Sequence, residues 1–268
     1  MYKKAYGIIE TLAPLHVGAT AGEESGNLNL IFRDQFTQTG IIPGSSLRGR
    51  FRAEMRNYAD EKEVSYWYGA GADSEQSDTN NESITKFEHA SIIWLPVFCP
   101  GQPIVWVSSR RLLERYKRIA GIKAETPDIY VASSNIKARE SRGKKTLFFN
   151  LGFLEISRTE DLSQWFPNGK ELPAVIVDDS DIAMIHDMAL YRQSRVRLKN
   201  DEKVVDGGGF FNTEALPEAT ILVFPIALRD DKSNKKWEPF PDNITSDIYF
   251  GGLESIGFGH CKLKIVNP

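Results

Sequence analysis

The sequence predicts an α+β fold, with helices on one face of an antiparallel sheet. Three observations favour this class: strand-like apolar stretches recur along the chain, amphipathic helix patterns interrupt them, and long polar segments separate several of these elements. With 268 residues, of which 41% are hydrophobic, the chain can bury a substantial core as one large domain or two small ones.

Strand patterns dominate the first half of the chain. We expect strands at residues 4–12, 87–98, 103–107 and 146–156. The first of these alternates loosely, with Tyr6, Ile8 and Glu10 on one side. By contrast, residues 87–98 are apolar almost throughout, which is typical of a buried strand.

Two helices are expected between these strands. Leu47, Phe51 and Met55 recur every four residues and predict one buried helix face. A second helix runs from a cap at Ser109 to about residue 120, with a basic side. Residues 70–82 are small, acidic and polar, as in a surface loop. Residues 122–145 lack periodicity, and we expect an insertion or a flexible arm there, not a core element.

The second half of the chain continues the mixed pattern. We expect strands at residues 174–177, 220–228 and 261–266 and a helix from caps in 178–181 to about 191. Residues 195–200 and 203–206 predict a β-hairpin whose turn is Asn200-Asp201-Glu202. Residues 247–250 are expected to open a final helix or turn.

The stretch at residues 41–56 carries the most chemistry. Pro43 and Gly44 break the preceding extended run, and Ser45 or Ser46 is a good N-cap for the helix. Four arginines follow on that helix: Arg48, Arg50, Arg52 and Arg56. Free N–H groups, hydroxyls and guanidinium groups together make an anion site, most simply for phosphates. The alternative is a surface helix whose charged face is merely solvated.

A glycine-rich loop near the C-terminal end is the second element with chemistry. It contains Gly251, Gly252, Gly257 and Gly259, which let a backbone pass close to another chain or a phosphodiester. No Lys-Ser or Lys-Thr pair follows, so it is not a Walker loop. The glycines precede an expected strand and not a helix, so a Rossmann dinucleotide site is excluded as well.

Composition limits the function classes. The net charge of −3 means that any contact with RNA or DNA must be a local patch. Cys99 and Cys261 fit neither a disulfide scaffold nor a zinc motif, and the four histidines show no ligand spacing. Residues 1–4 lead into no apolar signal region, and prolines break the most apolar window, residues 92–107. We expect a cytoplasmic protein without a membrane partner, a metal site or a cofactor.

Five motifs in order resemble the RAMP superfamily of CRISPR effector proteins, most closely the repeated backbone subunit of type III complexes. They are Pro14-Leu15-His16-Val17-Gly18; Arg33-Asp34 with Thr39-Gly40 and Ile42-Pro43-Gly44-Ser45-Ser46-Leu47-Arg48-Gly49; Leu95-Pro96-Val97 with Ser109-Arg110-Arg111-Leu112-Leu113; Gly208-Gly209-Phe210-Phe211 with Glu214-Ala215-Leu216-Pro217; and Gly251-Gly252 with Gly257-Phe258-Gly259. Arg48 stands where lysine is usual in the family.

The resemblance implies a modified ferredoxin-like (RRM-like) core in a single domain, residues 1–268. Insertions are expected at about 60–87 and 121–145, with a thumb-like β-hairpin at about 195–218. It also implies copies stacked head to tail along a CRISPR guide RNA, so the expected partners are guide RNA, target RNA, copies of this chain or related subunits, and other effector-complex subunits.

The RNA-binding residues that the resemblance implies lie in three places. They are His16, Gly44, Ser45, Ser46, Arg48, Arg50 and Arg52; Phe210 and Phe211; and Gly251, Gly252, Gly257 and Gly259. Phe210 or Phe211 would wedge or stack against a base, although core packing explains these rings equally well. His16 could be a catalytic base or a ligand, but a histidine here more often bonds nearby backbone.

Catalysis is where the sequence departs from the family. The family's aspartate for metal-dependent cleavage of target RNA falls at Leu28, and leucine neither ligates a metal nor moves a proton. This departure from the family pattern therefore favours a non-cleaving subunit. Two alternatives stay open: an endoribonuclease that uses Glu23, Glu24 or Asp34 with Mg²⁺, and a stand-alone nuclease that processes guide precursors with His260 and His16.

Overall fold

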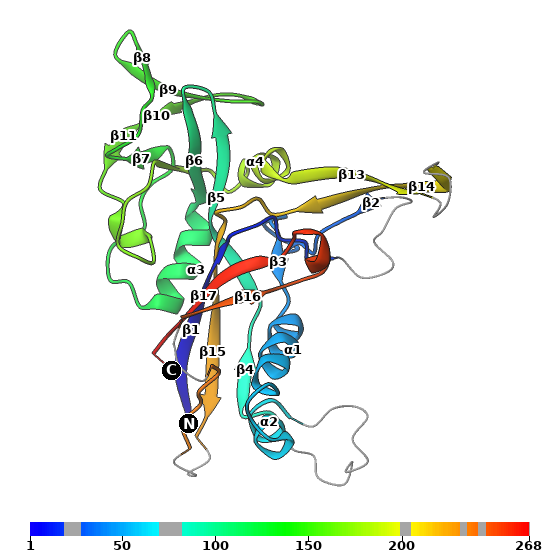
Figure 1. The fold of residues 1–268 in the computed structure, drawn as a ribbon. Coiled ribbons are helices and arrows are strands. Elements are labelled where there is room, and N and C mark those ends of the chain that lie inside the picture. The colour runs from blue at the N-terminus through cyan, green and yellow to red at the C-terminus, as the bar shows by residue number, and fades with distance from the viewer. Residues whose placement is uncertain (19–27, 70–81, 199–204, 231–234, 241–244, 268) are drawn as a thin grey trace.

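The computed structural model describes residues 1–18, 28–69, 82–198, 205–230, 235–240 and 245–267 (Figure 1). The helices are α1 (Gly44–Met55), α2 (Glu61–Tyr68), α3 (Arg110–Ala120) and α4 (Ile182–Ala189), with 3-10 turns η1 (Ser163–Trp165) and η2 (Glu254–Ile256). The strands are β1 (Tyr2–Thr11), β2 (Leu28–Asn29), β3 (Ile41–Ile42), β4 (Thr85–Phe87), β5 (Ala90–Cys99), β6 (Gln102–Ser109), β7 (Val131–Ser133), β8 (Arg139–Ser141), β9 (Lys144–Phe149), β10 (Gly152–Ile156), β11 (Arg158–Glu160), β12 (Ala174–Val177), β13 (Tyr191–Leu198), β14 (Val205–Ala215), β15 (Ile221–Arg229), β16 (Thr245–Tyr249) and β17 (His260–Val266).

One large sheet organises the molecule. Its main path runs β11-β7-β12-β6-β5-β15-β1-β17-β16, and two short strands, β3 and β4, pair with β5 and β15. Within it, β15 lies between β1 and β5 and is antiparallel to both. The connection from β1 through α1 to β5 therefore spans one intervening strand, as in a split βαβ unit. This arrangement confirms the expected α+β class with a mostly antiparallel sheet.

The first face of the sheet is covered by α1 and α2. Leu47, Phe51 and Met55 are buried, which confirms the predicted face of α1. The Phe51 ring is the hub of an aromatic cluster, with ring centroids 5.0 Å from Phe87 and 5.9 Å from Trp237. Because odd-numbered residues of β1 such as Ile9 belong to this same core, α1 and β1 contribute to one hydrophobic core.

The second face is covered by α3, so the expectation that all helices share one face is wrong. Leu113 and Tyr116 of α3 form a separate core with Ile8 of β1 and Val223 of β15. Neighbouring residues of β5 belong to different cores, because successive side chains of a strand point to opposite faces. The continuous apolar run of β5 is thus the signature of a strand that is buried on both sides.

Several element boundaries also differ from expectation. Pro43 and not a serine occupies the N-cap of α1, and no side chain caps the helix. Residues 247–250 form no helix or turn, because β16 extends the sheet beside β17. Residues 146–156 are two antiparallel strands, β9 and β10, and not one strand. In β10, Gly152 has φ +144° at the start of the strand, a value that favours glycine.

The segment at 121–145 is not simply a flexible arm. Val131 and Ala132 of β7 are fully buried, and β7 joins the large sheet between β11 and β12. The strand has only three residues, so no periodicity is visible in the sequence. Residues 139–145 add β8 and the start of β9, which form a second sheet with β10 at one end of the molecule (Figure 1).

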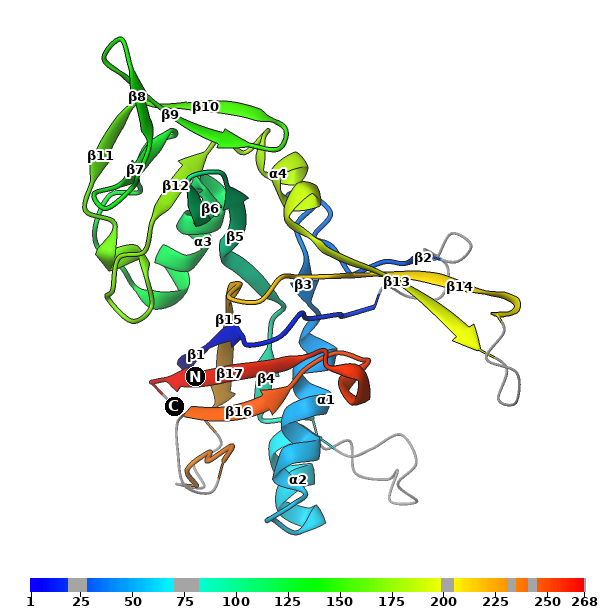
Figure 2. The same ribbon diagram turned by 45° about the horizontal axis from the view of Figure 1, so that its top comes forward.

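The β-hairpin is longer than predicted. β13 begins at Tyr191, directly after α4, and its register pairs Tyr191 with Ala215 and Leu198 with Val205. The predicted turn, Asn200-Asp201-Glu202, lies outside the described residues. Figures 1 and 2 both show the hairpin projecting from the body of the molecule, with β2 beside it. Within the described part of the chain, no helix has the length and apolarity that a membrane span needs.

Candidate nucleic-acid interface

The start of α1 is pressed against the edge of the sheet. A Cβ atom on Gly44 would lie 2.5 Å from the Phe87 carbonyl oxygen, so only glycine fits at this close approach. The first turn then presents Ser45 and Ser46, whose side chains are exposed and make no hydrogen bond to any described residue. Because they do not cap the helix, both hydroxyls are available to a ligand, together with the N–H groups of the first turn.

The arginines of α1 are mostly neutralised by carboxylates. Arg52 and Arg56 both contact Glu61 at the start of α2, at 3.3 and 3.2 Å. Arg48, by contrast, is exposed, and no ion pair or hydrogen bond joins its side chain to the described residues. Of the predicted arginine row, Arg48 therefore has its full charge available at the N-terminal end of the helix.

Arg50 connects α1 to the glycine loop. It pairs with Glu54 one turn along the helix, and its Nη1 lies 3.8 Å from Glu254 Oε1 in η2. This contact places η2, which lies inside the glycine loop, beside α1. The two regions that the sequence singled out separately thus form one continuous surface.

The glycine loop is shaped by contacts with the segment at 14–16. The Gly252 N–H donates to the His16 carbonyl at 2.9 Å, and the Gly259 N–H donates to the Pro14 carbonyl at 2.9 Å. Gly251 has φ +79°, and a Cβ there would lie 2.1 Å from the His16 oxygen. A close backbone approach therefore explains Gly251, while Gly252 and Gly257 have open space beside them.

His16 has a structural position. Its ring is buried, and Nδ1 lies 2.7 Å from the Glu214 carbonyl oxygen, to which it donates. The same residue accepts the Gly252 N–H through its backbone oxygen. His16 therefore joins the glycine loop to the end of β14, and this geometry favours the structural alternative for this histidine. His260, the other candidate acid or base, is half-buried and stacks on Tyr249 at 5.0 Å.

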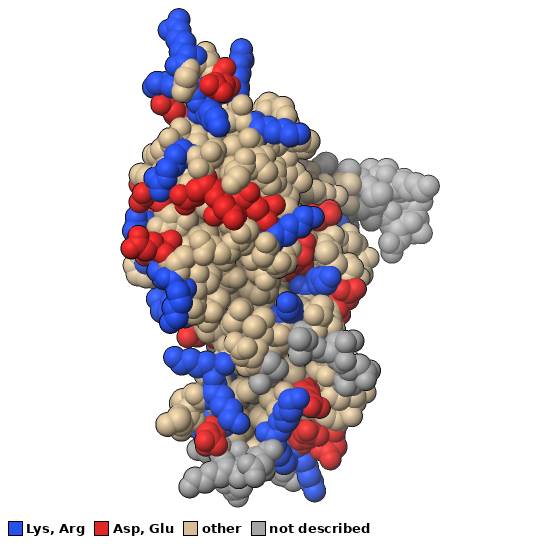
Figure 3. All heavy atoms as spheres, turned by 90° about the vertical axis from the view of Figure 1, so that its left-hand side faces the viewer, with Lys and Arg blue, Asp and Glu red and all other residues tan. Residues whose placement is uncertain are grey.

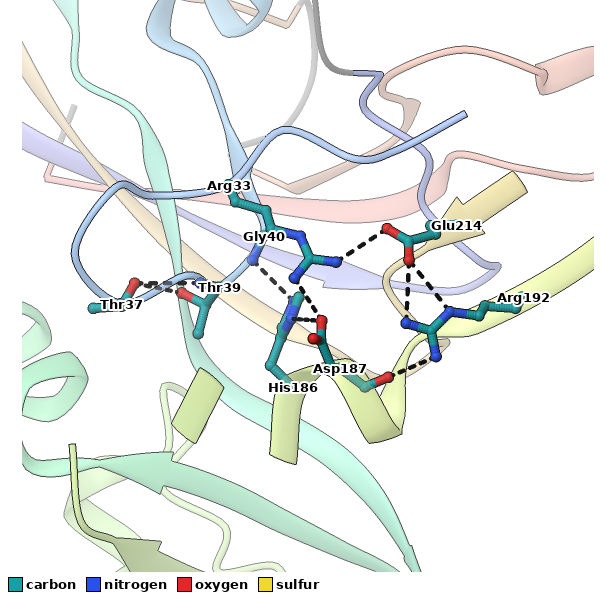
Figure 4. A network of polar contacts seen from close by, with 8 residues as sticks. All are labelled: Arg33, Thr37, Thr39, Gly40, His186, Asp187, Arg192 and Glu214. Carbon is teal, nitrogen blue, oxygen red and sulfur yellow. Dashed lines mark hydrogen bonds and ion pairs between the residues drawn. The ribbon is translucent and has the colours of Figure 1, made fainter. Parts of the chain in front are cut away.

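A network of charged groups surrounds the base of the hairpin (Figure 4). Glu214, whose side chain is only 4% exposed, accepts hydrogen bonds from Arg33 Nη2 at 3.1 Å and from Arg192 Nε and Nη2 at 3.2 and 3.1 Å. Arg33 also pairs with Asp187, and Arg192 donates to the Asp187 carbonyl at 2.9 Å. One buried carboxylate is thus bonded by two guanidinium groups from different segments.

His186 completes this network as a neutral side chain. Burial, together with the charge of Arg33, lowers the pKa of His186 to about 3. Its Nε2 accepts the Gly40 N–H at 2.9 Å, so the ring proton of the neutral form is on Nδ1. The histidine therefore fixes the backbone just before β3 and the start of α1.

The hairpin also contacts the glycine loop directly. The ring of Tyr191 meets Phe258 edge-on at 6.0 Å, and Arg195 lies over the same Phe258 ring at 5.4 Å. Phe211 is half-buried in β14 opposite Arg195. Phe210 belongs to the same strand, but its side chain lies outside the described part of the structure.

Asp34, the one acidic candidate for catalysis that the structure describes, is engaged in a local turn. Asp34 Oδ1 accepts the N–H groups of Phe36 and Thr37 and the Thr37 hydroxyl, as in an Asx turn. Partial burial raises the pKa of Asp34, but these hydrogen bonds outweigh it and the net pKa is lowered. Glu23 and Glu24 lie outside the described residues. The backbone of Leu28 pairs with Asn212 of β14, beside the hairpin.

Sequence reasoning did not find the charged network. Arg33 and Glu214 were noticed only as parts of separate family motifs, and Arg192, His186 and Asp187 gave no signal. Arg33 and Glu214 are 181 residues apart, so no periodicity connects them. A buried position for Glu214, on a strand otherwise rich in small residues, becomes visible only once the fold is known.

We predict that Glu214→Ala lowers the free energy of unfolding by about 3 kcal/mol, because it leaves two guanidinium groups without their buried partner. Chemical denaturation of the purified protein measures this change. Glu218→Ala is the matched control: that residue is exposed four positions along the chain, and its loss should change stability by less than about 0.5 kcal/mol. Equal effects of the two substitutions would contradict the assigned role of Glu214.

The buried His186 predicts a pH dependence of stability. Its folded-state pKa of about 3 lies below the ordinary value, so the unfolded chain binds a proton that the folded chain excludes. Above pH 6.5 the histidine is neutral in both states and does not make the free energy of unfolding depend on pH. As the pH falls from 6.5 towards 3, the free energy of unfolding decreases by at most about 1.4 kcal/mol per pH unit.

We expect wild-type protein to lose more stability between pH 7.5 and 5.5 than His186→Gln, whose amide oxygen can still accept the Gly40 N–H. Denaturation curves at both pH values measure the difference. His89, whose pKa is lowered by burial and by Arg115, is present in both proteins and cancels. Parallel curves for the two proteins would show that His186 is not buried in neutral form.

Comparison with known proteins identifies the family. A sequence profile of the RAMP superfamily matches residues 8–262. Among curated proteins, none matches the sequence significantly. The fold is similar to a chain in the cryo-EM structure of the type III-B Cmr-beta complex bound to cognate target RNA, with a TM-score of 0.72 and 19% identity over 98% of this chain and 97% of that chain.

Crystal structures give the same result. Oligomeric Cmr4 from Pyrococcus furiosus has a TM-score of 0.70 at 18% identity, covering 99% of this chain and 100% of that chain. Another crystal structure of Cmr4 has a TM-score of 0.69 at 17% identity, covering 99% of each chain. Because the family profile extends over nearly the whole chain and the fold agrees, this protein belongs to the RAMP superfamily.

Proposed function

We propose that this protein is a guide-RNA-binding backbone subunit of a type III CRISPR effector complex. Copies would stack along the guide RNA, each contacting the guide–target duplex, and would not cleave the target themselves. The observation that carries the proposal is the surface on which the free Arg48, the exposed hydroxyls of Ser45 and Ser46 and the glycine loop meet at the foot of the projecting hairpin.

The chemistry of this surface suits an RNA backbone. A guanidinium group, hydroxyls and backbone N–H groups recognise phosphate and ribose oxygens and carry no information about sequence. A subunit that holds any guide needs such sequence-independent contacts. The full-length similarity to Cmr4, including an oligomeric form, supports an assembly of repeated subunits.

The hairpin supports contact with paired strands. It projects away from the body, and its base is fixed by the Glu214 network and by Phe258. A rigidly anchored projection can separate neighbouring bases, whereas a loosely attached one would move with them. The sequence predicts that Phe210 or Phe211 meets a base. Of these two side chains, the structure describes that of Phe211, which is half-buried on β14.

The nucleic acid that copurifies with the protein tests this role. The protein would be produced with its genomic neighbours, and the bound RNA extracted and sequenced. Short RNAs with a common repeat-derived end are expected. A monomer that carries no RNA in the presence of those neighbours would contradict the proposal.

We predict that Arg48→Ala weakens guide binding about tenfold for every guide sequence, because a charged hydrogen bond contributes about 1.5–3 kcal/mol. The slope of log affinity against log salt should fall by about 0.7. Titration of labelled guides of two unrelated sequences measures both quantities. Arg56→Ala is the control, since that arginine is already paired with Glu61. A loss that depends on guide sequence would contradict a phosphate contact.

The absence of cleavage is tested at Leu28. A guide-loaded complex incubated with labelled target RNA and Mg²⁺ should leave the target intact, because leucine offers no oxygen to a metal or a proton. Leu28→Asp should introduce cuts at regular intervals if the family's catalytic position is assigned correctly. Regular cuts by the wild-type complex that vanish in Glu23→Ala/Glu24→Ala would overturn the non-cleaving assignment.

A further inference from the structure

The small sheet of β8, β9 and β10 carries a concentration of positive charge that the proposed function does not use. Residues 137–156 contain five lysines and arginines against two glutamates, a net charge of +3 in a chain whose total is −3. Figure 3 shows blue side chains gathered at this upper end of the molecule. The remaining residues of the chain therefore have a net charge of −6.

Most of these cations have no carboxylate partner among the described residues. Lys144 pairs with Glu155 at 2.9 Å. The exposed side chains of Lys137, Arg139, Arg142 and Lys145 form no ion pair with any described residue. The contrast with α1 is clear, because there most arginines have carboxylate partners.

Aromatic side chains lie on the same face of this sheet. Phe148 of β9 and Phe153 of β10 are directly opposite each other, so both rings point to one side. They are 38% and 76% exposed, and Leu151 in the connecting turn is 53% exposed. Lys144 and Thr146 lie on the same face as Phe148, because they are alternate residues of β9. Arg139 of β8 lies on that face as well, since it is directly opposite Thr146.

The opposite face anchors the sheet to the body. Leu147 is 1% exposed and belongs to the main core, and Leu154 packs against the same core. The outer aromatic face is therefore held in a fixed position. Leaving two phenylalanine rings in water is unfavourable, so their exposure points to a partner that covers them.

We propose that the outer face of the β8–β9–β10 sheet is a second nucleic-acid contact, which binds a single strand by stacking bases on Phe148 and Phe153 and by pairing phosphates with Arg139. Exposed aromatic rings set among uncompensated cations are the combination that single-strand binders use. A protein partner is less favoured, because the cores of protein interfaces are depleted in lysine. A duplex would offer no unstacked base to the two rings.

The test separates stacking from apolar docking. The full-length chain would be titrated with a fluorescein-labelled 15-nucleotide RNA, with DNA of the same sequence, and with a blunt RNA duplex. Phe148→Leu/Phe153→Leu keeps apolar surface but removes the aromatic faces, and Phe148→Tyr/Phe153→Tyr keeps them. Tyr2→Leu, at an exposed aromatic residue on β1, is the matched control.

The leucine pair should weaken single-strand binding about tenfold, since stacking on one base is worth about 1–3 kcal/mol. The tyrosine pair, the Tyr2→Leu control and duplex binding should be unchanged. The DNA arm decides whether the ribose hydroxyl takes part. Equal single-strand affinity of the leucine pair and wild type would overturn the proposal. So would a changed sedimentation coefficient with unchanged RNA affinity, which would mark a protein interface.

This inference does not rest on the guide-backbone role. Repeating the titration in an Arg48→Ala background removes the contact assigned to α1. If the leucine pair still weakens binding there, the second contact stands whether or not α1 holds a guide. If Arg48→Ala alone abolishes single-strand binding, the β8–β9–β10 face is not a nucleic-acid contact.

Discussion

The buried carboxylate of Glu214 is the constraint on which the functional surface depends. Its side chain bonds Arg33, from the segment that leads into α1, and Arg192, from the first strand of the hairpin. Its backbone oxygen accepts a hydrogen bond from His16, whose own carbonyl holds the glycine loop. Three segments that are distant in sequence therefore converge on one residue. Burying a carboxylate costs free energy unless its cationic partners are present. The segments that carry Arg33, Arg192 and His16 are therefore expected to become ordered cooperatively.

Charge is distributed unevenly over the molecule, and the distribution limits where a polyanion can bind. On α1, Glu54 and Glu61 compensate the arginines that lie further from the helix start, and Arg48 remains free. At the β8–β9 end, most cations have no partner among the described residues. On an acidic protein, two such places are where a polyanion would be attracted, while the rest of the surface would repel it.

The sequence was most informative where the pattern was local. The buried face of α1, the strand at residues 174–177 and the order of family motifs could all be read from spacing and residue type. The side of the sheet that each helix covers could not be read, because periodicity identifies a buried face but not the surface against which it packs. β7 was missed since three residues give no period. The Glu214 network was missed since its members are joined only by the fold, and His16 could be interpreted in either way until its partners were known.

The pairing of β1 has a consequence for the order of folding. This N-terminal strand is hydrogen-bonded on both sides, but its neighbours are β15 and β17, with Tyr2 opposite Arg229 and Thr11 opposite Cys261. During synthesis, β1 therefore has no pairing partner until β15 and then β17 have been made. Contacts of such long sequence separation slow folding and expose unpaired strands in the meantime. Both edges of β1 are accordingly open to incorrect strand pairing until β15 and β17 emerge.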